Sequence, residues 1–195
     1  MRPAELAECD DLTLLARARD ADRAAFAQLV RRHQSAALRV AAVICGSTTE
    51  AEDVVQDSMV DLHRHLGAYR GTGSVRAWML RIVANHAKNH VRSRVRRLRR
   101  DDRHARLHLR TVEGADQATE VALEHEALAA ALRRLTEHDR EVLACRFVTG
   151  LSEAETAEVL GTPLGTVKSR TSRALDRLQR QLAPSITDSG EKTDD

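Results

Sequence analysis

Two helix starts on either side of a tight glycine turn constrain the last third of the chain more than any other feature. Ser152 and Glu155 form a capping box, in which each side chain accepts a hydrogen bond from a free backbone N–H group at a helix start. We expect that short helix to end at Gly161, and Thr162 to cap a second helix that runs to Leu182. Two helices joined by so short a turn have the geometry of a helix-turn-helix.

The second helix of this pair has an apolar stripe and a polar face. The stripe is expected to be buried and consists of Val167, Ala174, Leu175, Leu178 and Leu182. The polar face carries side chains that donate hydrogen bonds to phosphates and guanine edges, namely Thr166, Lys168, Ser169, Arg170, Ser172 and Arg173. Because a recognition helix inserts its N-terminal half into the major groove, the pattern predicts binding to duplex DNA. The alternative, an αα-hairpin with a solvated basic face, does not explain both capping signals and the polar set.

The composition favours helices throughout the chain. Aromatic residues make up 2% of the 195 residues, and only three prolines occur. We therefore expect an all-α fold of two small helical domains joined by a flexible linker. No apolar run approaches the roughly 20 residues that cross a bilayer, and the first residues do not resemble a signal peptide, so we expect a cytoplasmic protein without direct membrane insertion. Cys9, Cys45 and Cys145 are too widely spaced for a disulfide framework or a metal motif.

Breaks in the helical pattern divide the chain. Apolar residues recur at helical spacing up to residue 98, become sparse between 99 and 118, and return near 119. Pro184 ends the second helical stretch, and an acidic tail follows it. The expected parts are an N-terminal tail (1–9), a first domain (10–98), a linker (99–118), a second domain (119–183) and a disordered tail (184–195).

Local signals predict three long helices in the first domain. The first helix is expected to stop at Gly46, and Thr49 with Glu52 forms a capping box for the second. Three glycines between 67 and 73 predict a loop, and Ser74 is expected to cap the third helix. These helices should pack as a compact bundle.

An acidic stripe runs along the second helix. Glu50, Asp53, Asp57 and Asp61 recur at three- and four-residue spacing, so they share one face. The helix dipole explains acidic residues in the first turn but not Asp57 and Asp61, which lie further in. The stripe is typical of a surface that binds a basic protein partner, and a plain solvated face remains the alternative.

The third helix has the opposite character. Polar and basic side chains line one face, namely Arg81, Asn85, Lys88, Asn89, Arg92 and Arg96. Such density beside a glycine-rich loop indicates a nucleic-acid surface. Tyr69 and Trp78 have rings that stack on unpaired bases, although a tryptophan near the start of an amphipathic helix is more often part of a core.

Four segments in order make the chain resemble a bacterial RNA polymerase sigma factor of the sigma-70 family, of the extracytoplasmic-function (group 4) type. They are residues 22–33 (DRAAFAQLVRRH), 51–57 (AEDVVQD), 74–85 (SVRAWMLRIVAN) and 165–170 (GTVKSR). The resemblance covers almost the whole chain. It implies that the first domain is a region-2 module and the second a region-4 module.

The resemblance implies promoter-specific initiation of transcription with RNA polymerase core and promoter DNA as partners. It implies that the acidic stripe binds the β′ clamp helices of core, through Glu52, Asp53, Gln56, Asp57 and Asp61. The β flap is implied as a second contact with core. It implies melting and capture of the −10 element by the loop at 66–74 and by Tyr69, Arg76, Trp78, Arg81, Asn85, Lys88, Asn89 and Arg92. The −35 element would be read by the polar face listed above, from Thr166 to Arg173. An anti-sigma factor is an implied partner, and no catalytic residue, metal or cofactor is expected.

The chain departs from the family pattern at three places. Asn89 stands where an aspartate is frequent, and Leu135-Thr136 stands where the family often has Leu-Pro. Thr171 and Ser172 replace a frequent apolar or aromatic residue in the recognition helix. The first two departures leave the fold intact. The third lies in the recognition helix and puts in question which −35 sequence that helix prefers.

Two other classes compete with this interpretation. A helix-turn-helix regulator would bind duplex DNA without core polymerase, but it needs a ligand pocket or phosphoacceptor strand that the sequence does not show. A metalloenzyme would use His86 and His90, four residues apart, with His63 and His65 nearby. That pair lacks the glutamate of the zincin motif and a third ligand.

Overall fold

The computed structural model describes residues 3–71, 73–101 and 120–182, which form helices and turns without a strand among them. The first domain contains α1 (Pro3–Glu8), α2 (Asp11–Arg19), α3 (Arg23–Cys45), α4 (Thr48–Arg64), the 3₁₀ turn η1 (Leu66–Ala68) and α5 (Val75–Asp101). The second domain contains α6 (Glu120–Arg134), α7 (Glu137–Leu143), the π-helical turn η2 (Ala144–Val148), α8 (Glu153–Leu160) and α9 (Leu164–Leu182). The all-α prediction is confirmed.

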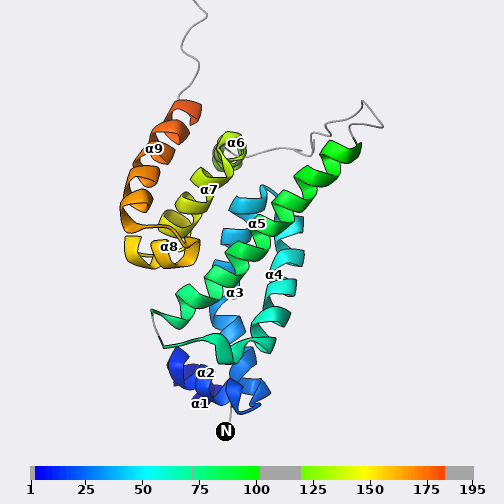
Figure 1. Ribbon diagram of the computed structural model, residues 1–195, viewed down its shortest axis with the longest axis vertical. Coiled ribbons are helices and arrows are strands. Elements are labelled where there is room, and N and C mark those ends of the chain that lie inside the picture. The colour runs from blue at the N-terminus through cyan, green and yellow to red at the C-terminus, as the bar shows by residue number, and fades with distance from the viewer. Residues whose placement is uncertain (1–2, 72, 102–119, 183–195) are drawn as a thin grey trace, which may run out of the picture.

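The first domain is a bundle of α3, α4 and α5, with α1 and α2 across one end (Figure 1). Gly46 adopts the left-handed conformation (φ +74°) that ends α3, as predicted. The predicted capping box of Thr49 and Glu52 is wrong. The left-handed turn places Ser47 in extended backbone directly before α4, and the Ser47 hydroxyl accepts from Glu50 N at 3.3 Å.

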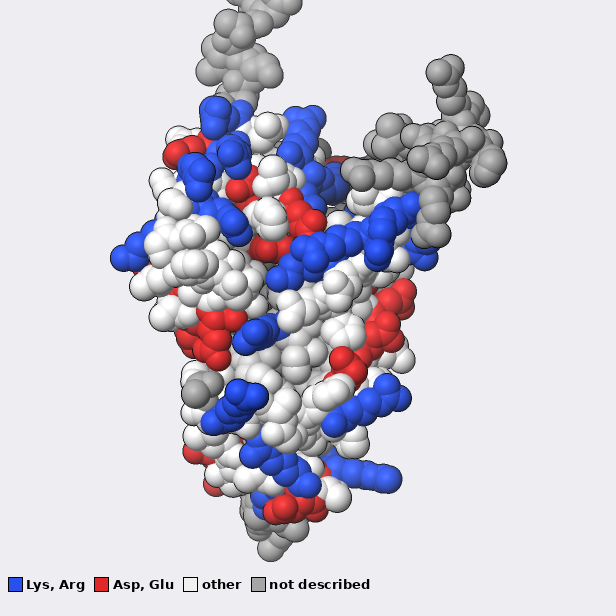
Figure 2. Space-filling view, viewed as in Figure 1, with Lys and Arg blue, Asp and Glu red and all other residues white. Residues whose placement is uncertain are grey.

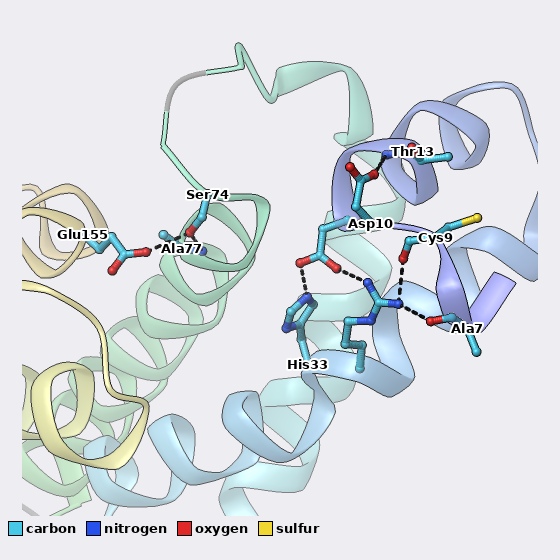
Figure 3. A network of polar contacts seen from close by, with 10 residues as sticks. Ala7, Cys9, Asp10, Thr13, His33, Ser74, Ala77 and Glu155 are labelled. Carbon is cyan, nitrogen blue, oxygen red and sulfur yellow. Dashed lines mark hydrogen bonds and ion pairs between the residues drawn. The ribbon is translucent and has the colours of Figure 1, made fainter.

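The segment predicted as an N-terminal tail contains α1. Leu6 is buried against the core between α2, α3 and α4, so apolar burial holds this short helix in place. Arg32 of α3 donates to the carbonyl oxygens of Ala7 and Cys9 at 2.9 and 2.8 Å. Figure 3 shows this network together with the contact between His33 Nε2 and Asp11 Oδ2 at 2.7 Å.

The helix starts of the second domain follow the predicted signals except at α9. The capping box of Ser152 and Glu155 is present, and Gly161 ends α8 with φ +61°. Thr162 does not cap α9, because its hydroxyl donates to Leu160 O at 3.3 Å. The carbonyl oxygen of Pro163 accepts the first backbone hydrogen bonds of α9 instead. Helix α9 therefore begins at Leu164, one residue later than a cap at Thr162 would require.

The apolar stripe of α9 is narrower than predicted. Val167 and Ala174 are buried, and Leu178 packs against the core. Leu175 and Leu182 are 40% and 43% exposed, which contradicts their assignment to the buried stripe. At 100° per residue, Leu175 lies about 80° around the helix from Val167, beyond the line that faces the domain core.

The ends of the two domains differ from the predicted boundaries. Helix α5 continues to Asp101, past residue 98 where the first domain was expected to end. Helix α6 begins at Glu120, close to the predicted start of the second domain. The rest of the predicted linker and the C-terminal tail from 184 lie outside the described residues.

One continuous cluster of buried apolar side chains joins the two domains. It includes Ala77 and Leu80 of α5 in the first domain and Leu151 and Val159 in the second. Helices α7 and α8 lie beside α3 and α5 (Figure 1), and the most extensive contact between the domains is that of α8 with α5. The domains therefore form one body in this structure.

Two of the three cysteines lie in this shared core. Burial raises the pKa of the Cys45 thiol to about 11 and that of the Cys145 thiol to about 12. Both therefore stay protonated and unreactive at neutral pH. Cys9 is half-buried. Within the described residues, no helix is both long enough and apolar enough to cross a membrane.

Candidate nucleic-acid interface

The acidic surface of α4 is the first of three surfaces that carry predicted site residues. Glu52, Asp53, Gln56 and Asp57 are exposed. Asp61 is half-buried and accepts from His86 Nε2 at 3.1 Å, and this hydrogen bond lowers the pKa of its carboxyl. Figure 2 shows acidic side chains along α4 beside a run of basic side chains over the C-terminal part of α5. The predicted set thus shares one side of α4, with Asp61 at its edge.

Glu50 does not extend this acidic surface. Arg94 Nη1 of α5 donates to both carboxylate oxygens of Glu50, at 2.9 and 2.7 Å, and His90 Nε2 lies 3.2 Å from Oε2. Glu50 therefore ties the start of α4 to α5. His86 and His90 contact carboxylates of α4, and no group of three metal-ligating side chains occurs among the described residues.

An apolar groove runs next to the acidic surface, between α3 and α4. It has a volume of about 680 Å³ and is lined by Phe26, Leu38, Met59 and Val60, and it reaches Glu52 at its rim. Val60 is 48% exposed, whereas the other apolar residues of α4 are buried or half-buried. Sequence patterns do not reveal this groove, because a half-exposed apolar residue at helical spacing has the same pattern as a core residue. A protein partner of α4 would meet both charge and apolar surface here.

The second surface is the loop between η1 and α5. Ser74 caps α5 as predicted, accepting from Ala77 N at 3.1 Å. Tyr69 is 6% exposed, and its hydroxyl donates to Gly73 O at 2.9 Å. Its ring packs edge-on against the half-buried Trp78, with ring centroids 5.6 Å apart. Tyr69 therefore supports the loop and Trp78 and does not itself present an open stacking face.

A pocket of about 440 Å³ brings four of the predicted −10 residues together. Tyr69, Trp78, Arg81 and Asn85 line it, and Arg70 lies beside them. Arg70 was missed because the loop has no helical period that would assign it to a face. The pocket also contains Glu158, a carboxylate from α8 in the second domain.

The remaining predicted −10 residues lie towards the second domain or on open surface. The guanidinium of Arg76 donates to the carbonyl oxygen of Thr149. Arg92 Nε lies 3.6 Å from Glu137 Oε1, and Lys88 is half-buried. Asn89 is exposed. One side of α5 therefore faces α7 and α8 in this structure.

The third surface is the polar face of α9. Four of the six predicted residues are exposed, namely Lys168, Ser169, Ser172 and Arg173, and the other two, Thr166 and Arg170, are half-buried. Arg173 Nε donates to Ser169 O at 3.1 Å, which holds its guanidinium along the helix. Thr171 Oγ1 donates to Val167 O at 2.8 Å, so its hydroxyl is used within the helix. The face is continuous and is not covered by any described element of the first domain.

Family models match the chain over parts of both domains. The model "Sigma-70 region 2" matches residues 29–97, and "Sigma-70, region 4" matches residues 125–178. The ECF RNA polymerase sigma factor SigM of Mycobacterium tuberculosis is 37% identical over 175 residues, which covers 90% of this chain and 86% of SigM.

Two solved structures have the same fold. One is CnrH in complex with the cytosolic domain of CnrY, with a TM-score of 0.68 and 29% identity over 88% of this chain and 96% of CnrH. The other is the sigma factor RpoE in complex with the anti-sigma factor NepR, from Bartonella quintana. It has a TM-score of 0.67 and 25% identity over 82% of this chain and 98% of RpoE.

Proposed function

Because the chain belongs to the extracytoplasmic-function group of the sigma-70 family, and is thus an alternative sigma factor that directs transcription, we propose a specific role for each of its three surfaces. The rival class, a helix-turn-helix regulator without core polymerase, is not favoured, since the region-2 model matches residues 29–97. A sigma factor acts with RNA polymerase, so its place of action is the cytoplasm.

The acidic surface of α4 binds the β′ clamp helices of RNA polymerase core. Asp53, Gln56 and Asp57 point into solvent, and Glu52 joins them to the apolar groove. Exposed carboxylates that serve no internal ion pair are available to steer a basic partner, and an adjacent apolar surface adds area to bury. The second domain makes its own core contact on the β flap.

The pocket of the first domain captures unpaired bases of the −10 element. The proposed function depends chiefly on this pocket. Trp78 offers an aromatic surface, while Arg81 and Asn85 offer hydrogen-bond donors at its wall. Unpaired bases need such a recess because their edges and faces are both exposed once the strands separate. Basic side chains gather over the C-terminal part of α5 (Figure 2), where they are available to contact the phosphate backbone of the captured strand.

The polar face of α9 reads the −35 element as duplex. Lys168 and Arg173 are exposed in the N-terminal half of the helix, the half that enters a major groove. An anti-sigma factor is a further partner, supported by the likeness to RpoE in its complex with NepR.

Run-off transcription with purified core polymerase tests this function. The wild-type chain should start transcripts at defined sites, and mapping those sites gives both promoter elements. Specific promoter binding by the chain alone, at a strength that core does not change, would instead support the regulator.

The core contact has its own test. Asp53→Ala with Asp57→Ala should weaken core binding at least about tenfold in a pull-down, because close charge pairs at interfaces couple by more than 1 kcal/mol. Glu8→Ala with Asp20→Ala removes two exposed carboxylates outside α4 and should leave core binding unchanged. Equal core affinity for both double variants would contradict the assigned role of α4.

A further inference from the structure

A side chain of the second domain lies in the strand-binding pocket of the first. Glu158 of α8 lines the same recess as Arg70, Arg81 and Asn85 and is half-buried there. A carboxylate accepts hydrogen bonds through both oxygens, whereas arginine and asparagine side chains donate them. The pocket therefore already contains an anionic acceptor where an unpaired nucleotide would place its own.

The loop at the mouth of the pocket is shaped to accept this carboxylate. Gly73 has φ +72°, and a Cβ atom at this position would run into the carboxylate of Glu158. Gly71 has a similar φ of +78°, yet a Cβ there would meet nothing within 4 Å. Both positions favour glycine because their backbone is left-handed. Only at Gly73 does the missing side chain also leave room for a residue of the other domain.

Specific polar contacts hold α8 in this position. Ser74 Oγ donates to Glu155 Oε1 at 3.1 Å, and Figure 3 shows the Glu155 carboxylate at the start of α5. A carboxylate at a helix N-terminus is stabilised by the helix dipole and by free N–H groups. The bond from Arg76 to Thr149 O and the shared apolar core add to this contact. The seating of α8 is thus built from several independent interactions.

We propose that Glu158 acts as an intramolecular competitor of the −10 strand and keeps the strand-binding pocket closed in the free chain. The inference rests on the proposed function of that pocket. An unpaired strand brings phosphates and base acceptors that need the donors of Arg70, Arg81 and Asn85. The strand and the Glu158 side chain cannot occupy this recess together, so α8 must leave α5 before the strand binds. Closure makes strand capture conditional on separation of the two domains.

The single tryptophan of the chain, Trp78, reports on this pocket directly. Glu158→Ala should make Trp78 fluorescence more accessible to the neutral quencher acrylamide. It should also raise the affinity of the free full-length chain for a fluorescein-labelled single strand of mixed sequence, about 12 nucleotides long. A gain of about fivefold or more is expected, since coupling between sites is commonly of that size. Glu126→Ala removes the same charge from an exposed site on α6 of the same domain, outside the pocket lining, and should change neither quantity.

A folded Glu158→Ala variant, verified by circular dichroism, with wild-type acrylamide quenching and wild-type strand affinity would overturn the proposal. An equal gain in Glu126→Ala would overturn it as well, because the effect would then be general electrostatics. Run-off transcription separates this result from the function itself. If wild-type chain and core still start transcripts at defined sites, the sigma-factor function stands and only closure by Glu158 fails. If no transcripts start, the function fails whatever Trp78 reports.

Discussion

The two nucleic-acid surfaces differ in whether the rest of the chain covers them. The pocket of the first domain contains Glu158, and Arg76 beside it contacts the second domain. The polar face of α9, by contrast, presents Lys168 and Arg173 to solvent. Both surfaces have similar chemistry, so composition does not separate them. The difference indicates that the closed chain offers its duplex-reading helix while it withholds its strand-capturing pocket.

The largest expected effect is on stability, and it concerns the ion pair that fixes α9 to α7 beneath the polar face of α9. Arg177 Nη1 of α9 lies 2.5 Å from Oδ2 of Asp139, a carboxylate that is only 2% exposed. Arg177→Ala leaves this buried charge without its partner and should lower the free energy of unfolding by about 2–3 kcal/mol, less than for a fully buried pair because Arg177 is partly exposed. Urea unfolding measures the loss. Arg180→Ala, an exposed cation one turn on, serves as control, and an equal loss in both would contradict the role of the pair.

The open surface itself should respond next. Arg173→Ala should cost about 1–3 kcal/mol in binding to the −35 duplex if its guanidinium contacts a guanine. The loss should be the same for the free chain and for the chain with core, since α9 is uncovered. Fluorescence anisotropy on duplexes with single base changes measures it. An equal loss on every duplex sequence would show a phosphate contact instead.

A buried carboxylate at the domain interface should make stability depend on pH. Burial raises the pKa of Glu141, which is 2% exposed and has one carboxylate oxygen without a partner. Lys88, His138 and Glu137 face it. Because the folded state then holds this proton more tightly than the unfolded state, the folded state loses stability as pH rises through the raised pKa, and the loss is complete once the group is ionised.

Glu141→Gln should therefore stabilise the chain by about 1 kcal/mol at pH values above the raised pKa, because the buried amide carries no charge. Below the ordinary pKa of a glutamate the advantage should disappear, since both states are then protonated. Thermal unfolding across this pH range measures the difference. Glu126→Gln, on the exposed side of α6, provides the control. A constant difference at every pH would rule out ionisation as the cause.

The smallest effect should distinguish the two loop glycines. Gly73→Ala and Gly71→Ala both strain a left-handed backbone, by about 1 kcal/mol. Gly73→Ala should in addition displace the Glu158 carboxylate and raise acrylamide quenching of Trp78. Gly71→Ala should not. Identical quenching in the two variants would show that Gly73 is required only for its backbone angle.

Helix boundaries were predicted well where a side chain bonds its own backbone within a few residues. The capping box of Ser152 and Glu155, the cap at Ser74 and the stop at Gly46 are all of this kind. The error at Thr49 arose because Ser47 has similar capping chemistry, and the backbone angle set by the turn at Gly46 decides which hydroxyl caps α4. The error at Thr162 arose because its hydroxyl bonds to Leu160 O, and α9 begins after Pro163.

The site was predicted in part for a similar reason. Trp78, Arg81 and Asn85 follow helical spacing, and the structure places them around one pocket. Arg70 was missed because a loop has no period. The apolar groove was missed because a half-exposed valine such as Val60 has the same sequence pattern as a buried one.

The sequence by itself determined the helices, their faces and the chemistry on each face. These depend on hydrogen bonds and side-chain spacing within about four residues, which any local window contains. Only the tertiary structure decided which face is covered. Glu158 meets Gly73, and Glu155 meets Ser74, across a separation in sequence that no local pattern spans. These contacts follow from the burial of an apolar surface that both domains share, and that burial depends on the whole fold.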